Sequence, residues 1–188
     1  MMGKKLLEWM TGFLLLALSA SACAAPFNPA DTTAPGATGD QTEFSDPFAY
    51  CAAVGTIDAP GERYAGPAVP EAIIEGLREK AEIGEDAPDD WVGAGTVWRC
   101  MDGDVWACFV GANLPCSEKA DTSATPQPEM ENFCEANPNA DVVPAAVTGR
   151  ATIYAWRCVD GVPEAGAQIA EPDAQGFLSD FWYELSAQ

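Results

Sequence analysis

Residues Val97–Cys108 read V-W-R-C-M-D-G-D-V-W-A-C, and this stretch decides the fold because its core, W-R-C-x-D-G, returns at Trp156–Gly161. An Asp-Gly pair between apolar and aromatic residues is a strong hairpin signal, since both turn positions must tolerate positive φ. Each occurrence therefore predicts a β-hairpin with a two-residue turn.

The two-residue turn fixes the register of the first hairpin. It places Arg99 opposite Trp106 and puts Cys100 and Cys108 on opposite faces of the pair of strands, because side chains alternate along a strand. Those two cysteines are therefore not expected to bond each other, whereas a three-residue turn would change this parity.

Three landmarks occur in the same order twice along the chain, which predicts an internal duplication. The first is a helix with an aromatic residue and a cysteine, the second is V-P-x-A followed by Ile or Val, and the third is W-R-C-x-D-G. Their positions are Phe48 with Cys51, Val69–Ile73 and Trp98–Gly103, then Phe133 with Cys134, Val143–Val147 and Trp156–Gly161. We expect a small α+β domain at 46–188, built from a repeated helix–loop–hairpin unit, with copies at about 46–116 and 126–188.

The N-terminus predicts export. Residues 1–22 combine Lys4 and Lys5, an apolar run, and small residues, which is the pattern of a signal peptide. The ending Ala20-Ser21-Ala22-Cys23 resembles the lipobox of bacterial lipoproteins, and the resemblance implies that Cys23 carries lipid and becomes the mature N-terminus. The alternative is ordinary signal-peptide cleavage after an A-x-A site, at Ala20-Ser21-Ala22 or at Ala22-Cys23-Ala24. Residues 23–45, rich in Pro, Ala, Thr and Gly, are expected to form a disordered tether.

The cysteine count favours lipidation. The sequence has seven cysteines, and removal of Cys23 leaves an even set, as disulfides in an exported protein require. If the copies are equivalent, each helix cysteine bonds the strand cysteine of its own copy. The expected bridges are Cys51–Cys100, Cys134–Cys158 and Cys108–Cys116, one of fifteen pairings that six cysteines allow. Metal binding is the rival interpretation, but the sequence contains no C-x-x-C pair and no histidine.

Other elements follow from local signals. Asp46-Pro47 and Gly55 bound a short helix, and helical spacing of apolar residues predicts a second at 71–81. The acidic stretch 82–90 is expected to be a solvated loop. A further helix is expected from Pro126, and Gly176–Leu185 is expected to be a strand. Pro163 should make its own strand an edge strand or an irregular segment.

The charge balance restricts the partners. A formal net charge of −20 disfavours nucleic acid and anionic lipid surfaces. Without histidine, neither a serine–histidine nor a cysteine–histidine nucleophile pair can be assembled, and the usual zinc-hydrolase ligands are missing. No cofactor and no metal site is expected.

Two arginines occupy equivalent positions in the predicted copies. Arg99 and Arg157 follow Trp98 and Trp156, and Trp106 is expected opposite Arg99. We consider them possible recognition residues, because arginine stacked on an aromatic ring is common in binding sites. The alternative is structural: each arginine covers a tryptophan and pairs with a surface acid.

The sequence thus predicts a lipid-anchored protein of the cell envelope, at the periplasmic face or the cell surface. The expected function is a non-catalytic binding module for an envelope protein or glycan. A carboxylate-type glycan-acting enzyme and a structural or stress-related surface protein are the alternatives.

Overall fold

The computed structural model describes residues 42–187, which fall within one compact unit. The predicted signal peptide, Cys23 and the tether up to residue 41 lie outside the described residues. At the start of the described part, the backbone N–H of Phe44 donates to the carbonyl of Arg63 at 2.9 Å, and the carbonyl of Phe44 accepts from Ala65 at 2.8 Å. The folded domain therefore includes Phe44, which the sequence placed in the tether.

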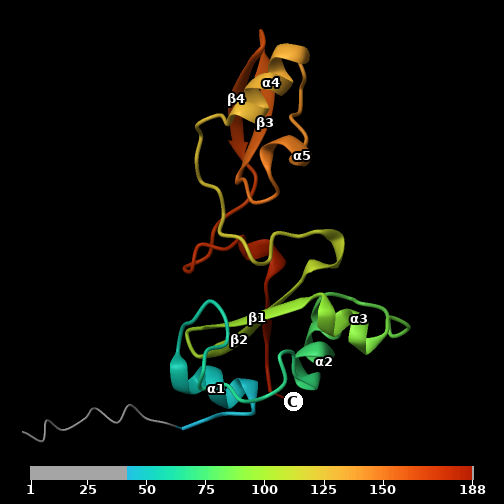
Figure 1. Cartoon of the computed structure of the whole chain (residues 1–188), viewed down its shortest axis with the longest axis vertical. Coiled ribbons are helices and arrows are strands. Elements are labelled where there is room, and N and C mark those ends of the chain that lie inside the picture. Colours follow the sequence, from blue (N-terminus) through green and yellow to red (C-terminus); the bar gives the residue numbers. More distant parts are fainter. Residues whose placement is uncertain (1–41, 188) are drawn as a thin grey trace, which may run out of the picture. The chain divides into compact units, whose positions relative to one another are not determined.

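Helices and antiparallel hairpins alternate along the chain, which confirms the α+β class (Figure 1). A first motif, residues 47–109, contains α1 (Pro47–Val54), α2 (Glu71–Lys80), α3 (Asp89–Ala94), β1 (Thr96–Met101) and β2 (Asp104–Phe109). A second motif, residues 128–168, contains α4 (Pro128–Ala136), α5 (Ala145–Thr148), β3 (Tyr154–Val159) and β4 (Val162–Gln168). The short 3-10 helices η1 (Val110–Ala112) and η2 (Ser179–Phe181) and the strand β5 (Tyr183–Leu185) complete the described elements.

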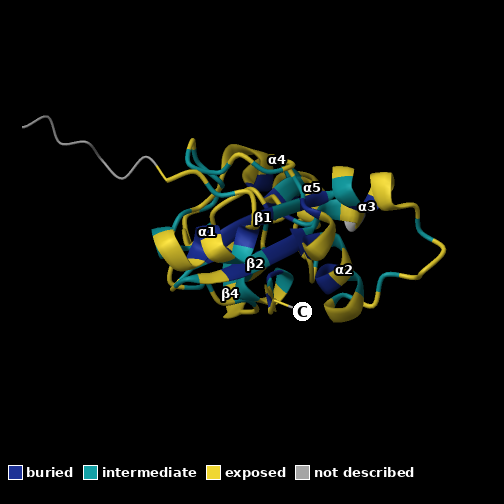
Figure 2. Ribbon diagram, turned by 90° about the horizontal axis from the view of Figure 1, so that it is seen from below, coloured by how far each residue is buried: buried dark blue, intermediate teal, exposed yellow. Residues whose placement is uncertain are grey.

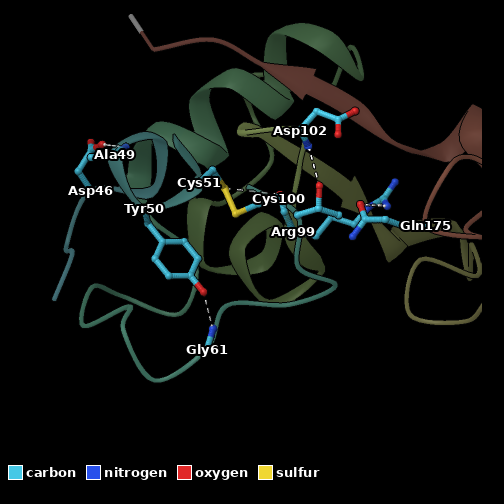
Figure 3. Close-up of a disulfide and its surroundings, with 10 residues drawn as sticks. Asp46, Ala49, Tyr50, Cys51, Gly61, Arg99, Cys100, Asp102 and Gln175 are labelled. Atoms are coloured by element: carbon cyan, nitrogen blue, oxygen red, sulfur yellow. Dashed lines mark hydrogen bonds between the residues drawn. A yellow bond between two sulfur atoms is a disulfide. The ribbon is translucent and has the colours of Figure 1, made fainter. Parts of the chain in front are cut away.

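The predicted helices form where their signals lie. The carboxylate of Asp46 accepts a hydrogen bond from the N–H of Ala49 at 2.7 Å, and Gly55 ends α1 with φ of +78° (Figure 3). The acidic stretch 82–90 is not a loop throughout, because Asp89 and Asp90 begin α3. Contacts from the preceding helix hold this segment: Arg78 of α2 donates to the carbonyls of Gly84 and Ala87 and forms an ion pair with Asp89.

Both hairpins turn on the Asp-Gly pairs, as predicted. Asp102 and Gly103 have φ of +55° and +93°, and Asp160 and Gly161 have φ of +50° and +85°. Arg99 lies opposite Trp106 in the resulting register. The expected register of the first hairpin is confirmed, and Cys100 and Cys108 lie on opposite faces of it.

The three disulfides are those that the sequence predicts. Cys51 of α1 bonds Cys100 of β1, and Cys134 of α4 bonds Cys158 of β3. Cys108 bonds Cys116 just beyond β2. Each of the first two bridges therefore fastens a helix to the first strand of its own hairpin. Figure 3 shows the first of them, between Cys51 and Cys100.

The two motifs share backbone contacts that the sequence did not show. In each, the segment after the helix pairs with the outer edge of the first hairpin strand and with the turn. The N–H groups of Gly103 and Cys100 donate to the carbonyls of Gly55 (2.9 Å) and Ile57 (3.0 Å), while those of Gly161 and Cys158 donate to Pro138 (2.9 Å) and Ala140 (2.8 Å). These shared contacts agree with a duplication, which itself stays a prediction.

The first hairpin is buried on both faces, and Figure 2 shows β1 and β2 as the largely buried elements of the first motif. On one face, Trp98 and Cys100 pack with Tyr50, Ile73 and Leu77 from α1 and α2. On the other face, a second cluster joins Cys108 to residues of the C-terminal segment, Phe177 and Trp182, with Val97 and Trp106 packed against it.

The C-terminal segment is not the single strand expected at Gly176–Leu185. Phe177 and Leu178, neighbours in sequence, are both buried, and only Tyr183–Leu185 is strand, paired with β2. Burial of the two successive side chains Phe177 and Leu178 breaks the alternation of buried and exposed positions that a half-buried strand shows.

In the part of the chain that the structure describes, the second hairpin pairs with no third strand. In the first sheet Val105 of β2 pairs with Leu185 of β5, whereas Pro163 of β4 occupies the position equivalent to Val105, opposite the bridged cysteine of β3. Proline has no N–H to donate to a further strand. The prediction that Pro163 lies in an edge strand is therefore confirmed.

Candidate functional site

Arg99 is fully buried in the second-face cluster of the first hairpin, with an exposed fraction of 0%. Its guanidinium forms an ion pair with Asp173 and donates from Nη1 to the side-chain oxygen of Gln175 at 2.6 Å (Figure 3). The carbon at its centre lies 4.5 Å from the ring centre of Phe177 and 4.2 Å from that of Trp182. Burial of the charge is tolerable because a carboxylate, an amide and two ring faces replace water around it.

A second cation extends this arrangement. Lys119 Nζ lies 3.7 Å from the ring centre of Phe177 and 2.6 Å from a carboxylate oxygen of Asp58. The side-chain amide of Gln175 donates to the same Asp58 carboxylate at 2.8 Å and so joins it to Arg99. The hydrogen bond from Lys119 lowers the pKa of Asp58 below its ordinary value, more than partial burial of the carboxyl raises that pKa.

Arg157 has the same register position as Arg99 but a different environment. Arg157 lies opposite Glu164, as Arg99 lies opposite Trp106. Its side chain is 59% exposed and forms an ion pair of 3.0 Å with Glu164, itself 46% exposed. The structure therefore does not bring the two arginines into equivalent surroundings.

The three tryptophans named by the sequence lie in different places. Trp98 and Arg99 project to opposite faces of β1, so the arginine stacks on the C-terminal segment and not on its neighbour. The Nε1 of Trp98 donates to the carbonyl of Ala68 at 2.8 Å. Trp106 packs beside the Arg99 cluster, and the buried Trp156 donates from Nε1 to the hydroxyl of Thr152 at 3.1 Å.

A groove of about 320 Å³ opens beside Trp156. Its apolar lining combines residues of the second motif with others that precede and follow it, namely Leu114, Pro115, Val142, Val143, Tyr154, Ile169 and Phe181. Val142 and Ile169 are 70% and 62% exposed, although both are large apolar residues. An apolar concavity with exposed aliphatic residues at its margin is typical of a binding site.

A second hollow of about 300 Å³ adjoins this groove, and the two share Asp141, Ala155 and Trp156. The second hollow is lined further by Arg157, Gly166 and Ala167. Of the residues predicted from sequence, Trp156 and Arg157 therefore take part in one concave surface, whereas Trp98, Arg99 and Trp106 belong to the interior or margin of the first motif.

No pattern in the sequence indicated the groove itself. Its apolar lining comes from segments between residues 114 and 181 that only tertiary contacts bring together. The nearest signal was the apolar pair Val142 and Val143, and a run of two residues is too short to define a helix or a strand.

Searches against protein-family models, curated proteins and solved structures returned no match for this chain. The class of protein therefore rests on the fold and its chemistry. Disulfides persist outside the reducing cytoplasm, so the three bridges indicate an extracytoplasmic α+β domain. Within residues 42–187, no helix has the length and apolar character needed to cross a bilayer.

Proposed function

We propose that this chain is a lipoprotein of the cell envelope whose folded domain is a non-catalytic binding module. The observation that carries the anchor is the use of the cysteines. All six cysteines of the described part form disulfides, and Cys23 is the seventh. Since Cys23 follows the lipobox-like Ala20-Ser21-Ala22, it is the cysteine available for acylation.

The groove beside Trp156 supports the binding function. Its volume of about 320 Å³ lies at the lower end of the range for ligand sites, and its lining is mainly apolar. The exposed side chains of Val142 and Ile169 at the same site are the kind of surface that a partner covers. The absence of histidine from the sequence removes the commonest general base, which favours binding over catalysis.

The anchor is tested by Cys23→Ala. We expect this variant to lose incorporation of labelled fatty acid and to leave the membrane fraction, while its six remaining cysteines stay unreactive to a maleimide under denaturing, non-reducing conditions. The matched control is the double variant Cys108→Ala/Cys116→Ala, which keeps Cys23 and should keep the label. An exported wild-type chain without lipid would refute the anchor.

The binding site is tested in cells with a photo-crosslinking residue at Val142. We expect a discrete adduct from this position and none from Trp91, an exposed apolar residue of α3 that serves as the control. Equal labelling from both positions, or none from Val142, would contradict a binding role for the groove.

A further inference from the structure

The two hairpins present equivalent faces that differ in what covers them. In the first motif, this face carries Val97, Arg99 and Trp106 and is covered by the chain's own C-terminal segment through Phe177 and Trp182. In the second motif, the corresponding residues Ala155, Arg157 and Glu164 are exposed. The same kind of sheet face is thus occupied in one motif and open in the other.

The occupied face shows what such a face binds. The carboxylate of Asp173 pairs with the Arg99 guanidinium, and the ring of Phe177, four residues later, stacks on it at 4.5 Å. The two oxygens of Asp173 have separate tasks: one meets Arg99 and the other accepts from the N–H groups of Gln175 and Phe177. A single turn of chain therefore supplies a carboxylate and a ring to one arginine.

The open face has room for a similar segment. Ala155 stands where the first hairpin has Val97, and the register of β3 and β4 shifts here, between Tyr154 and Trp156, so that Gly166 and Ala167 lie in an irregular stretch of β4. The smaller side chains border the hollow of about 300 Å³ that also contains Arg157. This hollow continues into the apolar groove through Ala155 and Trp156.

Arg157, the cation of the open face, can exchange its present partner for another at a small cost in free energy. Within residues 42–187, Arg157 forms its one ion pair with its cross-strand neighbour Glu164, and both side chains are about half exposed. Exposed pairs of this kind contribute little, so a partner's carboxylate can take the place of Glu164. A carboxylate in the more enclosed geometry, with a ring over the guanidinium, interacts more strongly than Glu164 does in water.

We propose that the face formed by Ala155, Arg157, Glu164 and Gly166 binds a segment of a partner protein in which a carboxylate precedes an aromatic residue by four positions. The carboxylate pairs with Arg157, and the ring packs over the guanidinium and into the hollow. The inference rests on the proposed binding function and names its partner chemistry. The C-terminal segment that packs on Arg99 through Asp173 and Phe177 is the model for how the partner segment binds at the equivalent position.

The test uses the full mature chain carrying Cys23→Ala and a blocked synthetic peptide of residues 171–183, which contains Asp173 and Phe177. Calorimetric titration should show one site on the wild-type domain, with a dissociation constant below about 1 mM, as expected for a short flexible peptide. Peptides with Asp173→Asn or Phe177→Ala should bind at least about tenfold more weakly, the loss that one charge-assisted contact represents.

Variants of the protein separate this site from the others. Arg157→Ala should weaken binding at least about tenfold, whereas Glu164→Gln should strengthen it severalfold, because the competing carboxylate is gone. Lys80→Ala is the control, since it removes an exposed positive charge from α2 and should leave binding unchanged.

Three results would overturn the proposal. The first is the absence of binding at a peptide concentration of about 1 mM, the upper limit of the expected dissociation constant. The second is unchanged binding to Arg157→Ala, which would mean that the peptide displaces the C-terminal segment from Arg99. The third is dimerisation of the wild-type chain that Arg157→Ala abolishes, which would assign the face to a second copy. Adduct formation from Val142 in cells without peptide binding would leave the proposed function standing and remove this inference alone.

Discussion

Replacement of Arg99 by methionine should destabilise the domain strongly, although methionine fills a similar volume. Arg99 is fully buried, and the side chain of its partner Asp173 is only 10% exposed. The substitution leaves that carboxylate without its cation and removes a cation from the rings of Phe177 and Trp182. Breaking a buried ion pair on one side costs about 3–5 kcal/mol.

The matched control is Arg157→Met at the equivalent register position. Its ion pair with Glu164 is exposed, so the expected loss is below about 1 kcal/mol. For a domain of this size, a loss of 3–5 kcal/mol lowers Tm by roughly 9–15 °C, and a loss below 1 kcal/mol lowers it by about 3 °C or less. Calorimetry and urea unfolding of the oxidised protein measure both values.

A second variant identifies the cause. If the cost of Arg99→Met comes from the stranded carboxylate, the double variant Arg99→Met/Asp173→Asn should recover more than about 1 kcal/mol of it, because a neutral amide is cheaper to bury. An Arg99→Met protein within about 1 kcal/mol of the wild type would refute the assignment of Arg99 as the centre of the cluster.

Two further predictions concern the bridges and the pH dependence. Removal of the Cys108–Cys116 bridge, with its sequence separation of 8, should cost about 2.5 kcal/mol, against about 4 kcal/mol for the bridge from α1 to β1 with its separation of 49, as measured by urea unfolding. A larger cost for the short loop would contradict the loop-entropy argument. Because the folded pKa of Asp58 lies below its ordinary value of 3.8, the ion pair with Lys119 stabilises the domain above that pH and its contribution is lost as pH falls through the folded pKa. Asp58→Asn should therefore be slightly less stable than the wild type at pH 7, by less than about 1 kcal/mol, since the ion pair is half exposed. At a pH below the folded pKa of Asp58 the two proteins should be equally stable. A difference in stability that does not change with pH would show that the carboxylate charge is irrelevant.

Local signals were sufficient where a few adjacent residues decide the conformation. The Asp-Gly pairs at Asp102 and Asp160 fixed both turns, because few residues adopt positive φ. From the turn the register follows, and with it the faces on which the cysteines lie. The pairing of the six cysteines was predicted from the ordered landmarks, since equivalent units place equivalent cysteines at bonding distance.

The local sequence signals failed where contacts from another element decide the conformation. The helix α3 begins inside the acidic stretch because Arg78 binds that segment from α2. The C-terminal segment alternates in sequence like a strand, yet Phe177 and Trp182 leave the strand geometry to stack on Arg99.

The α+β class, the two hairpins and the even set of bridging cysteines follow from turn conformation, strand parity and cysteine number, which are local or arithmetic properties of the chain. The choice of one pairing among fifteen depended on the repeated landmarks. Only the tertiary structure distinguished Arg99 from Arg157, two arginines in the same W-R-C-x-D-G motif. Arg99 is buried by a segment more than 70 residues further along the chain, whereas Arg157 is exposed on the two-stranded sheet of β3 and β4. Burial of an arginine depends on which distant segment covers its sheet face, and the residues of the face itself do not indicate that segment.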